Sequence, residues 1–190
     1  MTAAPVALVT GASAGMGRQI AVALAVAGFD VALIGRRTEG LQETADSVTA
    51  AARRALCLPV DVRDAAALSQ ALDAFLAWSE DRVDVLINAA GWPGPLSPPL
   101  PEISVADFDS VMATNLRAPF LTMSRLLPVM YRQGRGRIVN MGGNHGMRGR
   151  AGRAAFSASK WGLRGLSRSA ALEAGAHGVT VNLIAPGPVA

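Results

Sequence analysis

The chain alternates between short apolar runs and longer segments in which apolar residues recur every three or four positions. Runs of this kind are typical of strands that are buried on both faces of a parallel sheet. They are Val6 to Thr10, Val31 to Ile34, Ala55 to Pro59, Val83 to Ile87, Arg137 to Met141 and Thr180 to Ile184. The helical segments between them cover residues 15 to 27, 39 to 51, 64 to 78, 104 to 133 and 154 to 174. This alternation predicts a doubly wound α/β fold with helices on both faces of a parallel sheet.

The first apolar run leads directly into a glycine-rich turn, in which Gly11, Gly15 and Gly17 have the spacing G-x-x-x-G-x-G. A strand, a glycine turn and a helix together form a phosphate-binding geometry, because the N–H groups that open the helix point at the anion. Gly11 supplies the tight turn, Gly15 lets the backbone approach a pyrophosphate, and Gly17 lets helix and strand pack closely. The alternative is a glycine-rich turn that binds nothing.

The end of the second apolar run indicates which dinucleotide such a turn would bind. In units of this kind a carboxylate at that position binds the 2′-hydroxyl of NAD. Here the position is Gly35, and Arg36 and Arg37 follow it. Two guanidinium groups without a competing carboxylate favour a 2′-phosphate, and therefore NADP(H) over NAD(H). The alternative is that both arginines are solvated loop charges.

Three further features lie where strands end or inside the long helical segment. Asp61 follows the third apolar run and can accept from an adenine amino group while Val62 packs against the ring; alone, Asp61 is equally suited to a turn or a helix cap. The small residues in 88 to 91 let the backbone pass beneath a cofactor. Asn115 stands among apolar neighbours, so it either ties its helix to the backbone or holds a water molecule.

Composition sets broad limits on the protein. Of the 190 residues, 51% are hydrophobic and only 17% are charged, and neither linkers nor repeats interrupt them, which predicts one domain over 1–190. The net charge of +4 is a weak indication of anionic ligands. Cys57 stands alone, so it forms no internal disulfide and we expect a buried thiol in a reducing compartment. The apolar run from Ile20 to Phe29 is too short to span a membrane, and we expect a cytoplasmic protein.

Taken in order and spacing, these residues resemble the short-chain dehydrogenase/reductase family over essentially the whole chain. The shared positions are Thr10, Gly11, Gly15, Gly17, Asp61, Asn88, Ala89, Ala90, Gly91, Asn115, Lys160, Pro186 and Gly187. The resemblance implies a Rossmann-type three-layer core with strand order 3-2-1-4-5-6. Family members continue into a substrate lid and a seventh strand, both of which we expect to be missing here.

The resemblance also implies roles for individual residues. The glycine turn, including Ser13 and Met16, would contact the pyrophosphate, and Asp61 and Val62 the adenine. Asn88, Ala89 and Gly91 would shape the loop under the cofactor, Lys160 would bind the nicotinamide ribose, and Pro186 and Gly187 would complete the site.

The catalytic positions depart from the family pattern. The family's proton donor is a tyrosine four residues before the lysine, and its partner is a serine thirteen residues before that tyrosine. This sequence has Phe156 and Gly143 there, so only Asn115 and Lys160 remain of the catalytic set. His145 is the best candidate for a substitute acid, the alternative being a solvated loop side chain.

Three functions follow from these observations. The first is an NADP(H)-dependent oxidoreductase that acts on a small carbonyl or alcohol substrate with an atypical active site. The second, an alternative to the first, is a catalytically impaired NADP-binding pseudoenzyme or a regulatory subunit of an active paralogue. The third, nucleic-acid binding through arginines, is not expected because no aromatic residues are interleaved for base stacking.

We also expect a homo-oligomer, or pairing with a paralogue. The long helical segments offer Leu121, Leu126, Leu127, Leu163 and Leu166 as an apolar surface, and the run from Thr180 to Ile184 offers an uncovered apolar edge.

Overall fold

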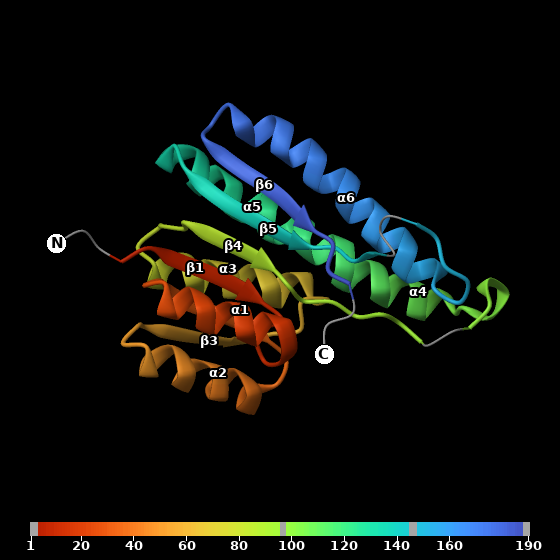
Figure 1. Ribbon diagram of the computed structural model, residues 1–190, viewed down its shortest axis with the longest axis horizontal. Helices are drawn as coiled ribbons and strands as arrows, with labels where there is room; N and C mark the ends of the chain where they lie inside the picture. Colours follow the sequence, from red (N-terminus) through yellow and green to blue (C-terminus); the bar gives the residue numbers. More distant parts are fainter. Residues whose placement is uncertain (1–3, 96–97, 145–147, 188–190) are drawn as a thin grey trace.

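The computed structural model describes residues 4–95, 98–144 and 148–187. Its strands are β1 (Val6–Thr10), β2 (Asp30–Gly35), β3 (Ala55–Pro59), β4 (Val85–Asn88), β5 (Gly136–Met141) and β6 (Val179–Ile184). They form one six-stranded sheet in the order β3-β2-β1-β4-β5-β6, and every neighbouring pair is parallel (Figure 1). The predicted strand order and fold class are therefore confirmed.

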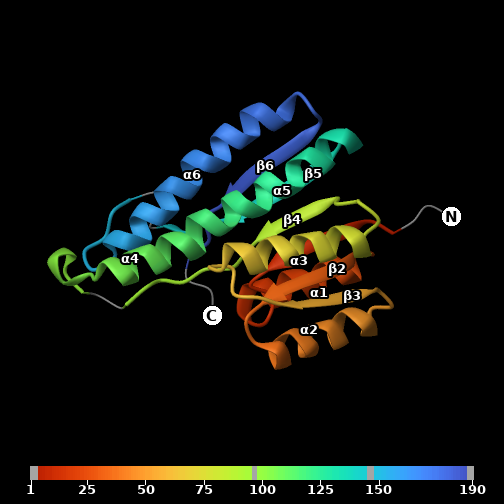
Figure 2. The same ribbon diagram turned by 180° about the vertical axis from the view of Figure 1, so that it is seen from behind.

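The helices cover the two faces of the sheet unequally. They are α1 (Gly15–Val26), α2 (Thr38–Ala50), α3 (Ala65–Trp78), α4 (Val105–Met112), α5 (Ala118–Gln133) and α6 (Ala154–Gly175). Buried residues of α1 and α2 pack with Val9, Val31 and Leu33 in one apolar cluster, whereas α3, α5 and α6 pack on the opposite face around Leu8 and Leu86. Figure 2 shows α3 and α5 lying across that second face. The chain thus forms the three layers that the alternating pattern predicted.

The long helix expected from residue 104 to 133 contains an irregular turn. Ser104 begins it as an N-cap, its Oγ accepting from the Asp107 N–H at 3.0 Å. Between α4 and α5 the chain makes a π-helical turn at Ala113–Arg117, and the helix ends at Gly134 with φ of 67°. Such turns are rare and occur mostly at functional sites. This one holds Asn115.

One expectation about the surface is wrong. Leu126 and Leu163 are fully buried, and Leu126 packs in the core cluster that covers one face of the sheet. The exposed large apolar residues on these helices are instead Phe120 and Trp161. Strand β6 does lie at the sheet edge, but its residues alternate between buried and exposed, so its outer face is not uniformly apolar. The oligomer stays a prediction.

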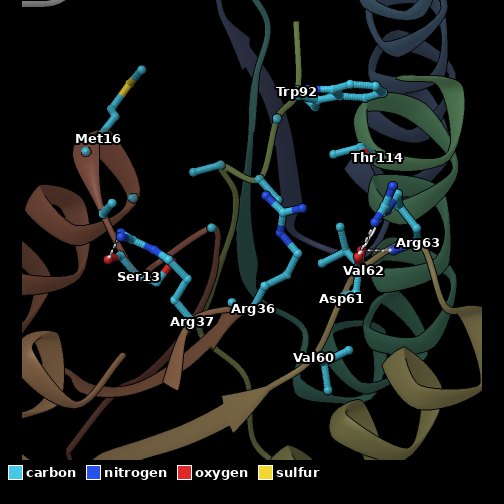
Figure 3. A pocket seen from close by; sticks show the side chains of 18 residues that line it. Ser13, Met16, Arg36, Arg37, Val60, Asp61, Val62, Arg63, Trp92 and Thr114 are labelled. Carbon is cyan, nitrogen blue, oxygen red and sulfur yellow. Dashed lines mark hydrogen bonds and ion pairs between the residues drawn. The ribbon is translucent and has the colours of Figure 1, made fainter. Parts of the chain in front are cut away.

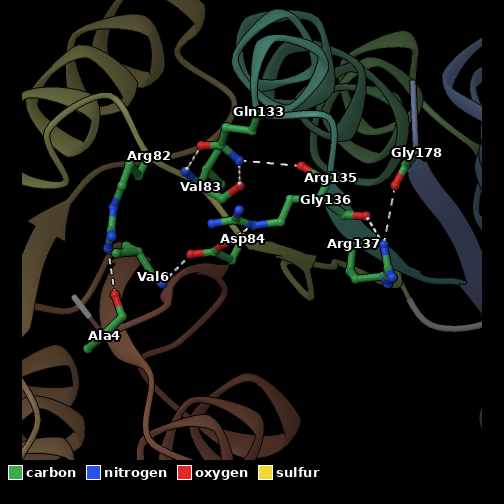
Figure 4. A network of polar contacts seen from close by, with 10 residues as sticks. All are labelled: Ala4, Val6, Arg82, Val83, Asp84, Gln133, Arg135, Gly136, Arg137 and Gly178. Atoms are coloured by element: carbon green, nitrogen blue, oxygen red, sulfur yellow. Dashed lines mark hydrogen bonds and ion pairs between the residues drawn. The ribbon is translucent and has the colours of Figure 1, made fainter. Parts of the chain in front are cut away.

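The amino-terminal edge of the sheet is occupied by a network of polar contacts (Figure 4). Asp84 accepts from the Val6 N–H at 2.9 Å and pairs with Arg135 at 3.2 Å. The Gln133 side chain accepts from the N–H of Val83 at 2.9 Å and donates to its carbonyl at 2.8 Å. These contacts tie β1, β4 and the end of α5 together, so the edge has a structural role.

Two further expectations concern the single cysteine and a possible membrane span. Cys57 is half-buried rather than fully buried, and burial raises the pKa of its thiol. No helix among the described residues is both long and apolar enough to cross a membrane.

Candidate functional site

The carboxyl ends of the parallel strands surround a cavity of about 510 Å³ (Figure 3). Ligands bind at this edge in open α/β sheets, where the strand order reverses. The cavity collects eleven of the residues that the sequence nominated for the cofactor. They are Gly11, Ser13, Gly15, Met16, Gly17, Arg36, Arg37, Asp61, Val62, Ala89 and Gly91.

The glycine turn is closed on one side and open on the other. Gly11 has φ of +72°, and a Cβ there would lie 2.7 Å from the Ala90 nitrogen, while a Cβ on Gly17 would collide with the Gly11 carbonyl. Gly15, in contrast, has no neighbour within 4 Å of its ideal Cβ position. Helix α1 begins there without a side-chain cap or an acidic residue in its first turn. Its first N–H groups are therefore left for an anionic ligand.

Arg36 and Arg37 act differently, although the sequence grouped them. Arg37 donates to the Ser13 carbonyl at 3.1 Å, and Arg18 donates to the same oxygen at 2.8 Å. Arg18 also pairs with Glu43 at 2.6 Å. Arg36 extends into the cavity in Figure 3, and no carboxylate among the described residues pairs with it. Arg37 thus braces the glycine turn, and Arg36 remains for a ligand.

Asp61 is held by a neighbour that sequence reasoning missed. The Arg63 guanidinium donates to both carboxylate oxygens, to Oδ2 at 2.6 Å from Nη2 and 3.0 Å from Nε, and to Oδ1 at 3.1 Å from Nε. Hydrogen bonding from Arg63 lowers the pKa of Asp61, with a smaller contribution from the charge of Arg36. Asp61 is therefore an oriented carboxylate at the cavity wall. Val62, beside it, is mostly buried in the core.

Asn88 shapes the loop from below and does not line the cavity. Its side-chain amide donates to Asn140 at 2.8 Å, and its oxygen accepts from the Thr122 hydroxyl at 2.8 Å. The next turn is fixed by Thr10, whose hydroxyl accepts from the Ala90 N–H at 3.1 Å. All four side chains are buried or nearly so, which makes the floor of the cavity rigid.

Asn115 ties its helix to the loop that follows β4, one of the two alternatives left open by the sequence. Its Oδ1 accepts from the Trp92 N–H at 2.8 Å, and its Nδ2 donates to the Trp92 carbonyl at 2.9 Å. Nδ2 also donates to the Ser159 hydroxyl at 3.0 Å, which in turn donates to the Phe156 carbonyl at 2.8 Å. Asn115 therefore links the π-helical turn to α6.

Lys160 is a buried cation. Lys160 is only 4% exposed, and its Nζ donates to the Met141 carbonyl at 2.7 Å. Burial lowers the pKa of Lys160 to about 8. Nζ also lies 5.6 Å from the centre of the Phe156 ring and 3.9 Å from the ideal Cβ position of Gly91.

A second cavity of about 340 Å³ has Pro93 in its wall, the residue that follows Trp92 in the wall of the larger cavity. It brings together the remaining residues named from the sequence and two arginines that were not assigned to the site. They are Gly143, Phe156, Pro186, Gly187, Arg150 and Arg153. Gly143 has φ of +153°, and a Cβ there would lie 4.0 Å from the Phe156 ring. His145 lies outside the described residues.

The fold is of the Rossmann type, and the larger cavity is a candidate dinucleotide site. The chain matches the model of the short chain dehydrogenase family over residues 5–190, and it belongs to that family. It is 35% identical over 189 residues to a levodione reductase from Leifsonia aquatica, a match that covers 97% of this chain and 69% of the relative.

Solved structures agree with this assignment. A metagenomic short-chain oxidoreductase in complex with NADP has a TM-score of 0.91 and 39% identity, covering 97% of this chain and 83% of that one. An NAD⁺-bound xylitol dehydrogenase has a TM-score of 0.91 and 31% identity, covering 96% and 70%. The chain is a short-chain dehydrogenase/reductase-type oxidoreductase of alcohol or carbonyl substrates, and its homologues bind NAD(P).

Proposed function

We propose that this protein binds NADP(H) in the larger cavity and a small carbonyl or alcohol substrate in the smaller one. The observation that carries the cofactor preference is the end of β2. Arg36 extends into the cavity there, and β2 ends at Gly35, where NAD-binding relatives of this fold carry an acidic side chain. A guanidinium in that place complements a 2′-phosphate.

The lining residues fit a dinucleotide along the cavity. The uncapped start of α1 at Gly15 would bind the pyrophosphate, Asp61 the adenine amino group, and Arg36 the 2′-phosphate. Lys160 and Asn115 would hold the nicotinamide end from beneath Gly91, whose ideal Cβ position is 3.7 Å from Asn115 Oδ1. The bound cofactor would supply or accept the hydride.

Proton transfer is where this active site differs from its relatives. Phe156 and Gly143 stand where the family has its hydroxyl groups, so neither supplies a proton or a donor to the substrate carbonyl. Loss of a positioned general acid typically slows a reaction by about 10²- to 10⁴-fold. We therefore infer slow carbonyl reduction, in which Lys160 keeps its electrostatic role without the hydroxyl between it and the substrate.

A second candidate is a dinucleotide-binding protein without redox turnover, such as a pseudoenzyme or the regulatory partner of an active paralogue. The observation that favours it is the Phe156 ring, which lines the smaller cavity and has its centre 5.6 Å from Lys160 Nζ, because Lys160 itself does not line that cavity. Measuring NADPH oxidation over a panel of carbonyl compounds distinguishes the two candidates, because only the first requires turnover.

The cofactor assignment is tested by calorimetric titration of NADPH and NADH into the wild type, Arg36→Ala and Arg37→Ala. We expect NADPH to bind at least about tenfold more tightly to the wild type, a difference of about 1.4 kcal/mol. Arg36→Ala should remove this preference by weakening NADPH alone. Arg37→Ala should weaken both dinucleotides, because it loosens the glycine turn at Ser13.

Arg132→Ala is the matched control, since this exposed arginine is remote from both cavities. An Arg36→Ala variant that still prefers NADPH tenfold would show that the 2′-phosphate site is elsewhere.

A further inference from the structure

We propose that the smaller cavity binds the anionic group of the substrate, so that the substrate is a small oxo acid or hydroxy acid. Arg150 and Arg153 are the residues that would recognise it. This inference rests on the proposed function for the redox reaction, but the anion site itself can be tested without turnover.

The charge in this cavity is of one sign. Two guanidinium groups line it, and none of its described lining residues is acidic. Arg153 is half-buried, and its Nη1 is fully buried without a hydrogen-bond partner among the described residues. A buried donor without an acceptor is unfavourable, so the protein itself does not satisfy the Arg153 guanidinium.

The acidic side chain that shares a hollow with Arg153 does not neutralise this charge. Asp107 shares a much smaller hollow with Arg153, but no ion pair joins them, and the Asp107 carboxylate accepts from the Ser104 hydroxyl at 2.7 Å. Asp107 is therefore engaged in capping α4.

The backbone adds to the positive potential. Arg153 is the N-cap of α6, and this helix begins without a side-chain cap and without an acidic residue in its first turn. A cation is unfavourable at the positive end of a helix, and an anion is favourable there. Two guanidiniums thus line the ligand volume, and one of them stands at the start of a helix.

The position of the cavity indicates where the reacting carbon would lie. Gly143, Phe156, Pro186 and Gly187 line the same space, and Pro93 in its wall follows Trp92 of the larger cavity in the chain. A carboxylate held by Arg150 and Arg153 leaves the remainder of a small molecule to reach toward Gly143 and the nicotinamide end. A guanidinium fork matches a carboxylate or a phosphate, so we take a carboxylate as the proposed anionic group and a phosphate as the alternative that the experiment tests.

The experiment compares acetoacetate with its uncharged methyl ester, and with dihydroxyacetone phosphate as a phosphate-bearing carbonyl. Each is titrated calorimetrically into the protein with and without saturating NADP⁺. We expect acetoacetate to bind at least about tenfold more tightly than the ester, as charge-assisted hydrogen bonds exceed neutral ones. Its affinity should fall with added salt, whereas that of the ester should not. Tighter binding of the phosphate compound would keep the anion site and overturn the carboxylate assignment.

Arg150→Ala and Arg153→Ala should each weaken acetoacetate at least about tenfold and leave the ester and NADPH unchanged. Arg132→Ala and Arg168→Ala remove one exposed charge each and should have no effect. Because Arg153 occupies the N-cap position of α6, Arg153→Lys serves as a second variant that keeps the charge and should restore part of the affinity.

Equal binding of acid and ester, or unchanged acetoacetate binding in both arginine variants, would overturn the proposal. Failure of the wild type to bind NADPH would instead contradict the proposed function, while acetoacetate binding to the cofactor-free protein would still test the anion site.

Discussion

The buried ammonium of Lys160 should make the folded protein more stable as the pH rises. Burial lowers the pKa of this side chain from 10.5 to about 8, while the unfolded chain keeps the ordinary value. At a pH between these two pKa values, the unfolded chain still binds a proton that the folded protein has released. The free energy of unfolding therefore increases with pH in this range. Below about pH 8 both states are protonated, and the folded protein carries the full cost of a buried cation.

The size of this stability change follows from the lowered pKa of Lys160. A difference of about 2.5 pKa units corresponds to about 3 kcal/mol, most of which appears between about pH 7.5 and pH 10. We expect urea denaturation to show that the wild type gains about 2 kcal/mol over Lys160→Met between those two pH values. The comparison between variants cancels groups that titrate in both, such as Cys57 and Tyr131.

A direct titration is also possible, because Lys160 is the only lysine in the sequence. Protein labelled with ¹³C at the lysine Cε should show a single side-chain resonance that titrates near pH 8. A midpoint above about pH 10, the ordinary range for lysine, would refute the reasoning, and so would a difference between wild type and Lys160→Met that does not change with pH.

Two further predictions concern the elements that position the site. Gly11→Ala should destabilise the protein by about 2–4 kcal/mol and abolish NADPH binding, because a Cβ at φ of +72° would collide with Ala90. In the control Gly134→Ala the new Cβ has open space around it, so chemical denaturation should show a loss of stability of only about 1–2 kcal/mol. Equal losses of stability in the two variants would contradict this account. Ser104→Ala should cost about 1 kcal/mol through loss of the α4 cap, with cofactor affinity unchanged. An unchanged thermal midpoint would show that the cap contributes nothing.

The sequence predicted the fold well because its signals are local. Apolar runs bounded by turn residues located every strand, and β3 has the predicted bounds at Ala55–Pro59. Glycine spacing located the turn after β1, whose tight contacts at Gly11 and Gly17 require residues without side chains.

The parts that sequence reasoning missed depend on contacts between distant segments. The π-helical turn contains Asn115, whose side chain bonds to Trp92 and Ser159. The periodicity of apolar residues along a helix does not reveal one extra residue in a single turn. The unequal roles of Arg36 and Arg37 depend on the position of the Ser13 carbonyl.

Side-chain direction explains the remaining errors. Leu126 and Leu163 have helical spacing that suits an outer or an inner face, and only the packing of the folded chain, which buries both, decides between them. Arg63 was missed because its partner, Asp61, was assigned to the adenine alone.

The central claim is that the dinucleotide site is complete while the proton donor is missing. The most direct measurement is NADPH oxidation by the wild type and Phe156→Tyr, each saturated with NADPH, over one panel of carbonyl compounds. Phe156→Tyr should reduce at least one of them about tenfold or more faster than the wild type, because it places a hydroxyl beside Lys160.

Gly143→Ser alone should gain less, since φ of +153° strains a serine, and the double variant should exceed either single change. Wild-type reduction as fast as that of Phe156→Tyr, or a variant that binds NADPH and reduces no member of the panel, would contradict the account.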